Sequence, residues 1–172
     1  MILRWALAVL ILPFNVLVVV PGLLLYAFRG GACAHAWAHP GGPRFILAVL
    51  LALLGLEFAF LTVGLFVRHG EGTAAPWDPP KKFVVRGPYL HVRNPMILSV
   101  FVVQAAEALF TGSWPVFGWL LTFIAANLLY IPLSEEKGLE KRFGADYAAY
   151  KRSVPRWIPR LAPYLPGNPS KS

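Results

Sequence analysis

Long apolar runs are the feature that most constrains this chain of 172 residues. Four runs, each bounded by charged residues or by Pro and Gly, read as membrane spans over residues 5–28, 45–67, 96–110 and 114–133. A helix of about 20 residues crosses the hydrocarbon core of a bilayer, so the first, second and fourth runs are long enough and the third is short. The sequence therefore predicts an all-α integral membrane protein with four transmembrane helices in a single membrane domain, 1–172.

Composition agrees with lipid as the main solvent of the protein. Hydrophobic residues make up 57% of the chain and charged residues only 14%, whereas roughly a quarter of the residues in a soluble domain are charged. A water-soluble fold of this length could not bury so much apolar surface. The composition therefore excludes a soluble enzyme, a fibrous protein and a disordered tail.

The basic residues indicate how the spans are oriented. The formal net charge is +8, and every Lys and Arg except Arg29 and Arg44 lies in the N-terminus, in the loop 68–95 or in the tail 134–172. Four spans put these three segments on one side, which the positive-inside rule assigns to the cytoplasm. Topology thus explains the charge, and we expect no nucleic-acid partner. A composition rich in Ala, Gly, Pro and Arg favours a bacterial inner membrane, and the oligomeric state is left open.

The loop 68–95 ends in a good helix start. Asn94 suits the N-cap position and Pro95 the first helical position, so the third span begins there. The free N–H groups and the positive dipole end of that helix lie beside Arg93, where a carboxylate or phosphate group can bind. A capped helix with an interfacial arginine explains the same residues equally well.

The tail begins with an acidic pair, Glu135 and Glu136, at the expected membrane surface. An amphipathic stripe follows it, formed by Leu139, Phe143, Tyr147 and Tyr150. This spacing predicts a cytoplasmic helix over about 135–152 that lies along the lipid headgroups. An acidic pair at a helix end is usually solvated and structural, so its interest comes from sharing one surface with Arg93.

No metal site is expected. Cys33, His35 and His39 lie in a short loop without a closing fourth ligand, which is a poor zinc pattern. The sequence also lacks a Gly-x-Gly-x-x-Gly motif after a strand, a P-loop and a His-Glu-x-x-His motif. Any nucleotide-containing cofactor must therefore be held by a different arrangement.

Four features follow one another between the loop and the tail. They are Gly87-Pro88-Tyr89, then Arg93-Asn94-Pro95 at the start of a span, then a helical hairpin, then Glu135-Glu136 with the tail run from Phe143 to Arg156. In this order and placement they resemble the isoprenylcysteine carboxyl methyltransferase and phospholipid methyltransferase family, in its bacterial form. The resemblance covers about half of the chain, from the loop to residue 160.

The resemblance implies an integral membrane enzyme that binds S-adenosylmethionine between the cytoplasmic ends of its last helices and the tail. It implies that Arg93 and Asn94 act as catalytic residues. The residues that it assigns to the cofactor are Gly87, Tyr89, Arg93, Asn94, Pro95, Glu135, Glu136, Tyr147, Tyr150 and Arg152. The arginine suits the carboxylate of the cofactor, and the glutamates suit its ammonium group or ribose hydroxyls.

These observations predict a membrane-embedded, S-adenosylmethionine-dependent methyltransferase whose acceptor is a lipophilic or small thiol, carboxylate or amine. Methyl transfer from a sulfonium mainly requires alignment and desolvation of the reactants, so the chain needs no nucleophile or metal. Two alternatives stay open: an NADPH-dependent sterol-type membrane reductase, similar near the C-terminal Tyr-x-x-Tyr, and a small membrane transporter or assembly protein. The second would depend on Glu57 and Glu107, the carboxyl groups inside the spans.

Overall fold

The computed structural model describes residues 13–30, 36–69 and 82–165, and within these ranges the regular structure is all helical. The turns η1 and η4 are π-helical, and η3 is a 3₁₀ turn. The elements in chain order are η1 (Asn15–Val19), α2 (Val20–Ala27), α3 (Pro43–His69), η3 (Gly87–Leu90), α4 (Pro95–Thr111), α5 (Trp114–Tyr130), η4 (Ile131–Glu135) and α6 (Glu136–Ser153).

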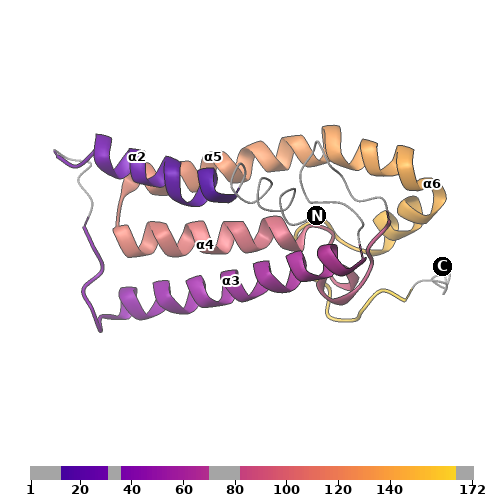
Figure 1. The fold of residues 1–172 in the computed structure, drawn as a ribbon, viewed down its shortest axis with the longest axis horizontal. Coiled ribbons are helices and arrows are strands. Elements are labelled where there is room, and N and C mark those ends of the chain that lie inside the picture. Colours follow the sequence, from indigo (N-terminus) through magenta and orange to yellow (C-terminus); the bar gives the residue numbers. More distant parts are fainter. Residues whose placement is uncertain (1–12, 31–35, 70–81, 166–172) are drawn as a thin grey trace.

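The helices α3, α4 and α5 run along the long axis of the molecule. α4 lies between α3 and α5, and α2 packs beside α5 (Figure 1). The indole Nε1 of Trp119 on α5 donates a hydrogen bond to the carbonyl of Val16 in η1 at 3.0 Å, which ties the N-terminal helix to the bundle. α3 ends, α4 begins and α6 lies at the same end of the bundle, which we call the polar end.

Small residues let α3 and α4 approach each other closely. A Cβ atom on Gly55 of α3 would lie 2.7 Å from a methyl carbon of Val103 and 3.1 Å from the carbonyl oxygen of Ser99, so only glycine fits there. Thr62 on α3 and Ser99 on α4 are fully buried, and each hydroxyl donates to a carbonyl within its own helix. Interfaces of this kind are typical of helices that pack in a membrane.

A tight helical hairpin closes the end of the bundle opposite the polar end. α4 is followed by Gly112 at a φ of 57°, and α5 begins two residues later. A Cβ atom on Gly112 would lie 2.5 Å from the carbonyl oxygen of Ala36, so the segment before α3 packs directly on the turn. The Ala38 amide also donates to the Phe110 carbonyl at 2.7 Å. The hairpin holds α4 and α5 antiparallel.

Two helices are long and apolar enough to cross a membrane, judged by length and composition. They are α3, with 27 residues, and the continuous helix Trp114–Ser153, with 40 residues. α4 and Asn15–Ala27 are shorter apolar helices, so a membrane protein is supported whereas four crossings are not confirmed. Residues 5–12 of the first predicted run lie outside the described residues. α3 and α4 extend the runs 45–67 and 96–110 by at most two residues at either end.

α5 and α6 form one continuous helix. The sequence predicts a separate tail helix along the headgroups, but α5 continues through η4 into α6 without a break and the first interruption comes only at Gly144. Pro132 does not stop the helix because it lies in η4, a π-helical turn whose closing bond runs from the Glu136 amide to the Ile131 carbonyl. A wider turn of this kind accommodates carbonyls that a proline leaves without a donor. α6 therefore begins as an extension of α5.

Gly144 turns the chain back over the polar end. Its φ of 52° and ψ of −125° are non-helical values inside α6, in a region open essentially to glycine alone. The segment after α6 then pairs with the loop before α4. Its backbone hydrogen bonds run from Arg93 N to Pro155 O at 2.9 Å, from Arg160 N to His91 O at 3.0 Å and from Tyr164 N to Leu90 O at 2.9 Å.

Candidate functional site

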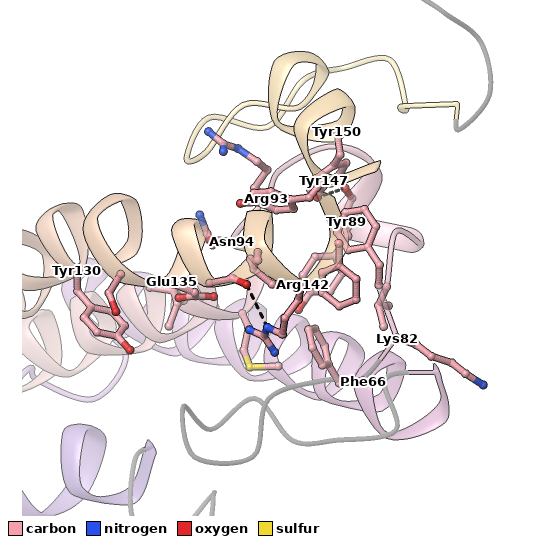
Figure 2. A pocket seen from close by; sticks show the side chains of 18 residues that line it. Phe66, Lys82, Tyr89, Arg93, Asn94, Tyr130, Glu135, Arg142, Tyr147 and Tyr150 are labelled. Carbon is pink, nitrogen blue, oxygen red and sulfur yellow. Dashed lines mark hydrogen bonds between the residues drawn. The ribbon is translucent and has the colours of Figure 1, made fainter. Parts of the chain in front are cut away.

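A cavity of about 310 Å³ lies at the polar end, among the last turn of α3, the start of α4 and the junction of α5 with α6 (Figure 2). Its volume is at the lower end of the range for small-molecule sites. The lining residues are Phe66, Lys82, Phe83, Val84, Tyr89, Arg93, Asn94, Met96, Ile97, Tyr130, Ser134, Glu135, Gly138, Leu139, Arg142, Phe143, Tyr147 and Tyr150. Aromatic and aliphatic side chains thus surround a small number of charged groups.

One face of the continuous helix supplies much of the cavity wall. The members of this face are Ser134, Glu135, Gly138, Leu139 and Arg142. Residues three or four positions apart lie on the same side of a helix, which is the spacing within both 134/138/142 and 135/138/142. The Nε of Arg142 donates to the carbonyl of Gly138 at 3.2 Å, which fixes the guanidinium along the wall.

Aromatic residues from both sides of the kink at Gly144 form the upper wall. The hydroxyl of Tyr150 donates to the carbonyl of Tyr89 at 2.7 Å, and both residues are buried. The ring of Phe83 lies 5.2 Å, between centroids, from the ring of Tyr150. Burial raises the pKa of Tyr147 to about 12 and also raises the pKa of Tyr89 and Tyr150, so the three hydroxyls stay protonated at neutral pH.

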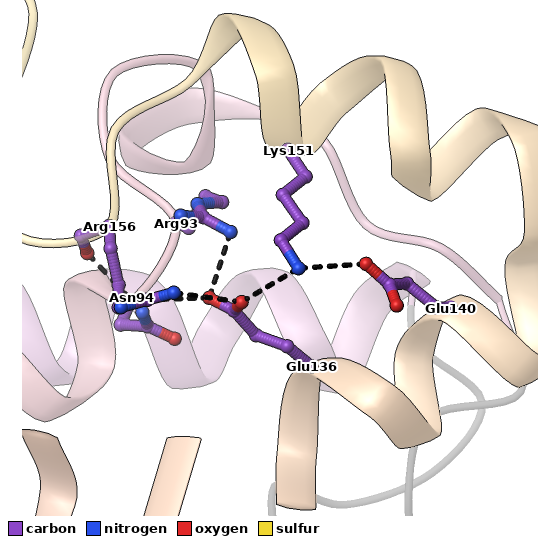
Figure 3. A network of polar contacts seen from close by, with 6 residues as sticks. All are labelled: Arg93, Asn94, Glu136, Glu140, Lys151 and Arg156. Atoms are coloured by element: carbon purple, nitrogen blue, oxygen red, sulfur yellow. Dashed lines mark hydrogen bonds and ion pairs between the residues drawn. The ribbon is translucent and has the colours of Figure 1, made fainter. Parts of the chain in front are cut away.

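Glu136 is the centre of an ion cluster beside the cavity (Figure 3). Its side chain is 2% exposed and accepts hydrogen bonds from Arg93 Nη1 at 2.8 Å and from Arg156 Nε at 2.7 Å. Lys151 Nζ lies 3.2 Å from its other oxygen and 2.8 Å from Glu140. These five residues come from the start of α4, from both halves of α6 and from the segment that follows. The ion cluster therefore fastens residues 145–165, the part of α6 after Gly144 and the segment that follows it, over the cavity, and we call this part of the chain the cap.

The two neighbouring glutamates are electrostatically different. Burial raises the pKa of Glu135 above its ordinary value of 4.5, the charge of Glu136 raises it further, and Arg142 opposes this only in part. Burial also acts to raise the pKa of Glu136, but the hydrogen bonds from Arg156 and Lys151 and the charge of Arg93 lower it overall. Glu136 is thus a fixed anion, whereas Glu135 accepts a proton more readily.

The structure brings six of the ten predicted cofactor residues to the cavity. They are Tyr89, Arg93, Asn94, Glu135, Tyr147 and Tyr150. The other four do not line it. Gly87 opens η3 at a φ of 55°, Pro95 is the buried first residue of α4, Glu136 belongs to the ion cluster, and Arg152 is exposed on α6.

Arg93 and Asn94, the predicted catalytic residues, lie at the start of α4. Asn94 is the N-cap residue, but its side chain makes no capping bond, and its Nδ2 donates instead to the carbonyl of Arg156 at 3.2 Å. Arg93 donates a hydrogen bond from Nη1 to Glu136, while its buried Nε has no hydrogen-bond partner in the described part of the chain. Because a buried donor without a partner is destabilising, this nitrogen is suited to an acidic ligand.

The described residues contain no group of three or more His, Cys, Asp or Glu side chains that could hold a metal ion. Cys33 and His35, two members of the weak zinc pattern, lie outside the described residues. The third, His39, donates its Nδ1 hydrogen to the carbonyl of the adjacent Pro40 at 2.9 Å.

Sequence reasoning did not assign the other lining residues to the site. Gly138 and Arg142 could have been found from helical spacing, since they lie three and seven positions after Glu135 on one helix face. No sequence signal links Phe66 or Lys82 to that face. Both lie far from α6 in the chain, and the fold alone brings them together.

The comparison with known families agrees with this geometry. The family model for phospholipid methyltransferases matches residues 43–146, which is more than half of the chain. The match begins at the first residue of α3 and ends just after Gly144, so it contains every lining residue except Tyr147 and Tyr150. Neither the curated proteins nor the solved structures gave a match. The chain belongs to the phospholipid methyltransferase family.

Proposed function

We propose that this protein is a membrane-embedded methyltransferase that binds S-adenosylmethionine in the cavity and methylates a lipophilic acceptor. Family membership supports methyl transfer and gives no support to a sterol-type reductase or a transporter. The observation that carries the proposal is the cavity, which gathers Arg93, Glu135 and four tyrosines within and just after the matched segment.

The residues around the cavity fit this cofactor. Within the described chain, the unpartnered Nε of Arg93 suits its carboxylate, and the carboxyl group of Glu135 suits its ammonium group or ribose hydroxyls. The rings of Phe83 and Tyr147 suit the adenine and the sulfonium cation. When bound, the cofactor supplies a methyl group that the sulfonium has already activated.

The chain itself contributes binding, orientation and exclusion of water. The ion cluster fixes the guanidinium of Arg93, and the N-terminus of α4 adds a positive dipole end beside it. The hydrogen bond from Tyr150 to the Tyr89 carbonyl closes the cap over the reactants. Positioning in a dry site of this kind accounts for much of the rate gain expected for a displacement reaction.

The lower wall of the cavity favours an acceptor that arrives from lipid. Phe66 comes from α3, Met96 and Ile97 come from α4, and Tyr130 comes from α5, so three apolar helices contribute. An apolar chain can lie along these residues while a thiol, carboxylate or amine group points toward Glu135. The acceptor class is therefore lipophilic, and its reactive group is one of these three.

The proposed function also includes a membrane topology. All four helical runs cross the bilayer, with both termini and the cavity on the cytoplasmic side of a bacterial inner membrane, because the basic residues gather on that side. α4 has 17 residues and spans about 26 Å, slightly less than a typical hydrocarbon core. Its polar start at Arg93 therefore lies at the level of the headgroups.

The first experiment measures cofactor binding by titration calorimetry on the purified protein in detergent. Wild type should bind S-adenosylmethionine, and Glu135→Gln should weaken binding about tenfold, the effect of losing one charge-assisted hydrogen bond. Glu140→Gln is the matched control, because this carboxylate is 42% exposed and lies outside the cavity lining. Absence of binding to wild type would refute the proposal.

A second experiment identifies the acceptor. Labelled methyl transfer should be followed into membrane lipid extract, prenylated thiols and small thiols. Ile97→Trp fills the apolar wall, so it should raise the KM for a lipophilic acceptor while the cofactor Kd stays unchanged. Equal transfer to small and lipophilic acceptors would contradict the assignment of the apolar wall.

A further inference from the structure

In the C-terminal segment 154–165, the part 158–165 turns its aliphatic side chains outward and its charged side chain inward. Ile158 is 80% exposed and Leu161 is 100% exposed. Arg160 is the one charged residue between positions 157 and 165, and its Nη1 donates to the carbonyl of Ser153 at 2.8 Å. A segment that faced water would show the opposite arrangement, with the guanidinium outside and the leucine inside.

The backbone of this segment is fixed, so its apolar side chains stay on the outside. Arg160 and His91 exchange two hydrogen bonds, one from the Arg160 amide at 3.0 Å and one from the His91 Nδ1 at 2.7 Å. Two more backbone hydrogen bonds join the same two segments. The Arg93 amide donates to the Pro155 carbonyl and the Tyr164 amide donates to the Leu90 carbonyl, each at 2.9 Å. The outward apolar surface is therefore a property of the folded cap.

The segment also reaches down the apolar part of the bundle. The ring of Trp157 packs on Phe101 of α4, with 5.5 Å between ring centroids. Phe101 lies six residues after the first residue of α4, which is about 9 Å along the helix axis. Among the described residues, the buried Nε1 of Trp157 has no hydrogen-bond partner, so the indole lies in apolar surroundings. The neighbouring Ile158 projects outward at the level of a membrane helix.

We propose that residues 157–165 form an interfacial anchor, in which Ile158 and Leu161 insert into the lipid leaflet beside the start of α4. The occupant of this surface is lipid, because the α4 level that Trp157 reaches is apolar and because exposed Arg152 lies just before the segment. Basic residues next to apolar ones are typical of segments that bind anionic headgroups. The anchor holds the loop before α4, so it sets the height of the cavity at the membrane surface.

The test uses nitroxide labels on single cysteines at positions 158, 161 and 152, in a background with Cys33→Ser. The full chain is reconstituted in vesicles of phosphatidylcholine and phosphatidylglycerol, and each label is exposed to oxygen, which partitions into lipid, and to a water-soluble nickel chelate. The ratio of oxygen to nickel collisions should be several-fold higher at 158 and 161 than at 152. Only variants that keep the wild-type melting temperature are compared.

Each other outcome overturns the anchor. Nickel collisions at 158 and 161 equal to those at 152 would mean that the segment faces water. Protection from both reagents would mean that protein covers it, and spin–spin broadening that disappears on dilution with unlabelled protein would identify a second copy as the cover. No cofactor or acceptor is added, so the result does not depend on the methyltransferase proposal.

Discussion

Glu135 and Glu136 are adjacent in the chain but belong to two different regions of the polar end. Glu136 lies in the ion cluster, where two arginines and a lysine surround its carboxylate. Glu135 lies in the cavity wall, where burial and its neighbour raise its pKa. The pKa of Glu136 is lowered instead. Two identical side chains have thus acquired opposite properties.

Helix geometry explains this contrast. Adjacent residues on a helix point about 100° apart, so one of the pair faces the cap segment and the other faces the cavity. A carboxylate saturated by cations fixes the elements that carry those cations, whereas one with fewer partners keeps capacity for a ligand. We interpret Glu136 as the residue that holds the cap in place and Glu135 as the residue that binds a ligand within the cavity.

The largest expected effect comes from Glu136→Gln. This change leaves the buried Arg93 without its counter-ion and loosens Arg156 and Lys151, so the free energy of unfolding should fall by about 3 kcal/mol. Thermal unfolding in detergent measures it. Glu140→Gln is the control and should stay within about 0.5 kcal/mol of wild type, because that pair is exposed. Equal melting temperatures for the two variants would show that the buried Glu136 stabilises the fold no more than the exposed pair does.

Gly144→Ala should have the next largest effect, because Gly144 connects the two regions. An L side chain at a φ of 52° and a ψ of −125° is strained, at a cost of about 2 kcal/mol in stability. Gly138→Ala on the same helix is the matched control, since the nearest neighbour of its Cβ would be 3.8 Å away and alanine favours helix. A Gly144→Ala variant that unfolds no earlier than Gly138→Ala would show that the kink is not required.

Tyr150→Phe tests the cavity side alone. The change removes the hydroxyl that donates to the buried carbonyl of Tyr89 and leaves the ion cluster intact, so stability should fall by about 1 kcal/mol. Tyr26→Phe, at an exposed position on α2, should change nothing measurable. Chemical denaturation of the purified proteins gives both values, and a loss as large as that of Glu136→Gln would contradict the ranking of the two regions.

The smallest effect is a pair of pH dependences with opposite signs. Glu136 stabilises the fold above its ordinary pKa of 4.5, and this contribution disappears as the pH falls through its lowered folded pKa. Glu135 has a raised folded pKa, so its ionisation lowers stability as the pH rises from 4.5 through that folded value. Relative to wild type, Glu136→Gln should lose melting temperature toward neutral pH and Glu135→Gln should gain it. The same sign for both variants would contradict the contrast.

Much of the helical framework is predictable because apolar runs have clear ends. Pro and charged residues bracket the run 45–67, and Asn94 with Pro95 marks the start of α4. The continuity of α5 with α6 is not predictable from these rules, since the apolar run ends at residue 133 and Pro132, just before that end, favours a kink. A π-helical turn absorbs this proline, and such a turn depends on tertiary packing that no local pattern records.

The sequence predicts the chemistry of the site better than it predicts which residues line the cavity. Local motifs identify Arg93, Asn94 and Glu135. Asn94 is a capping residue at the predicted start of a helix with Arg93 beside it, and Glu135 is a charged residue at the predicted end of a span. They do not separate Glu135 from Glu136, since the partner of the second glutamate, Arg156, lies 20 residues further along. The bond from Asn94 to the Arg156 carbonyl is equally remote in sequence.

The pairing between the loop before α4 and the segment after α6 also determines when the cavity can form during synthesis. The partners are far apart in the chain, as His91 and Arg160 are 69 residues apart, so closing them is among the most non-local steps in folding. The ribosome must deliver residue 164 before the last of these backbone bonds can exist. The helices of the bundle, which are translated first, therefore wait with an incomplete cavity for the final part of this segment to be translated.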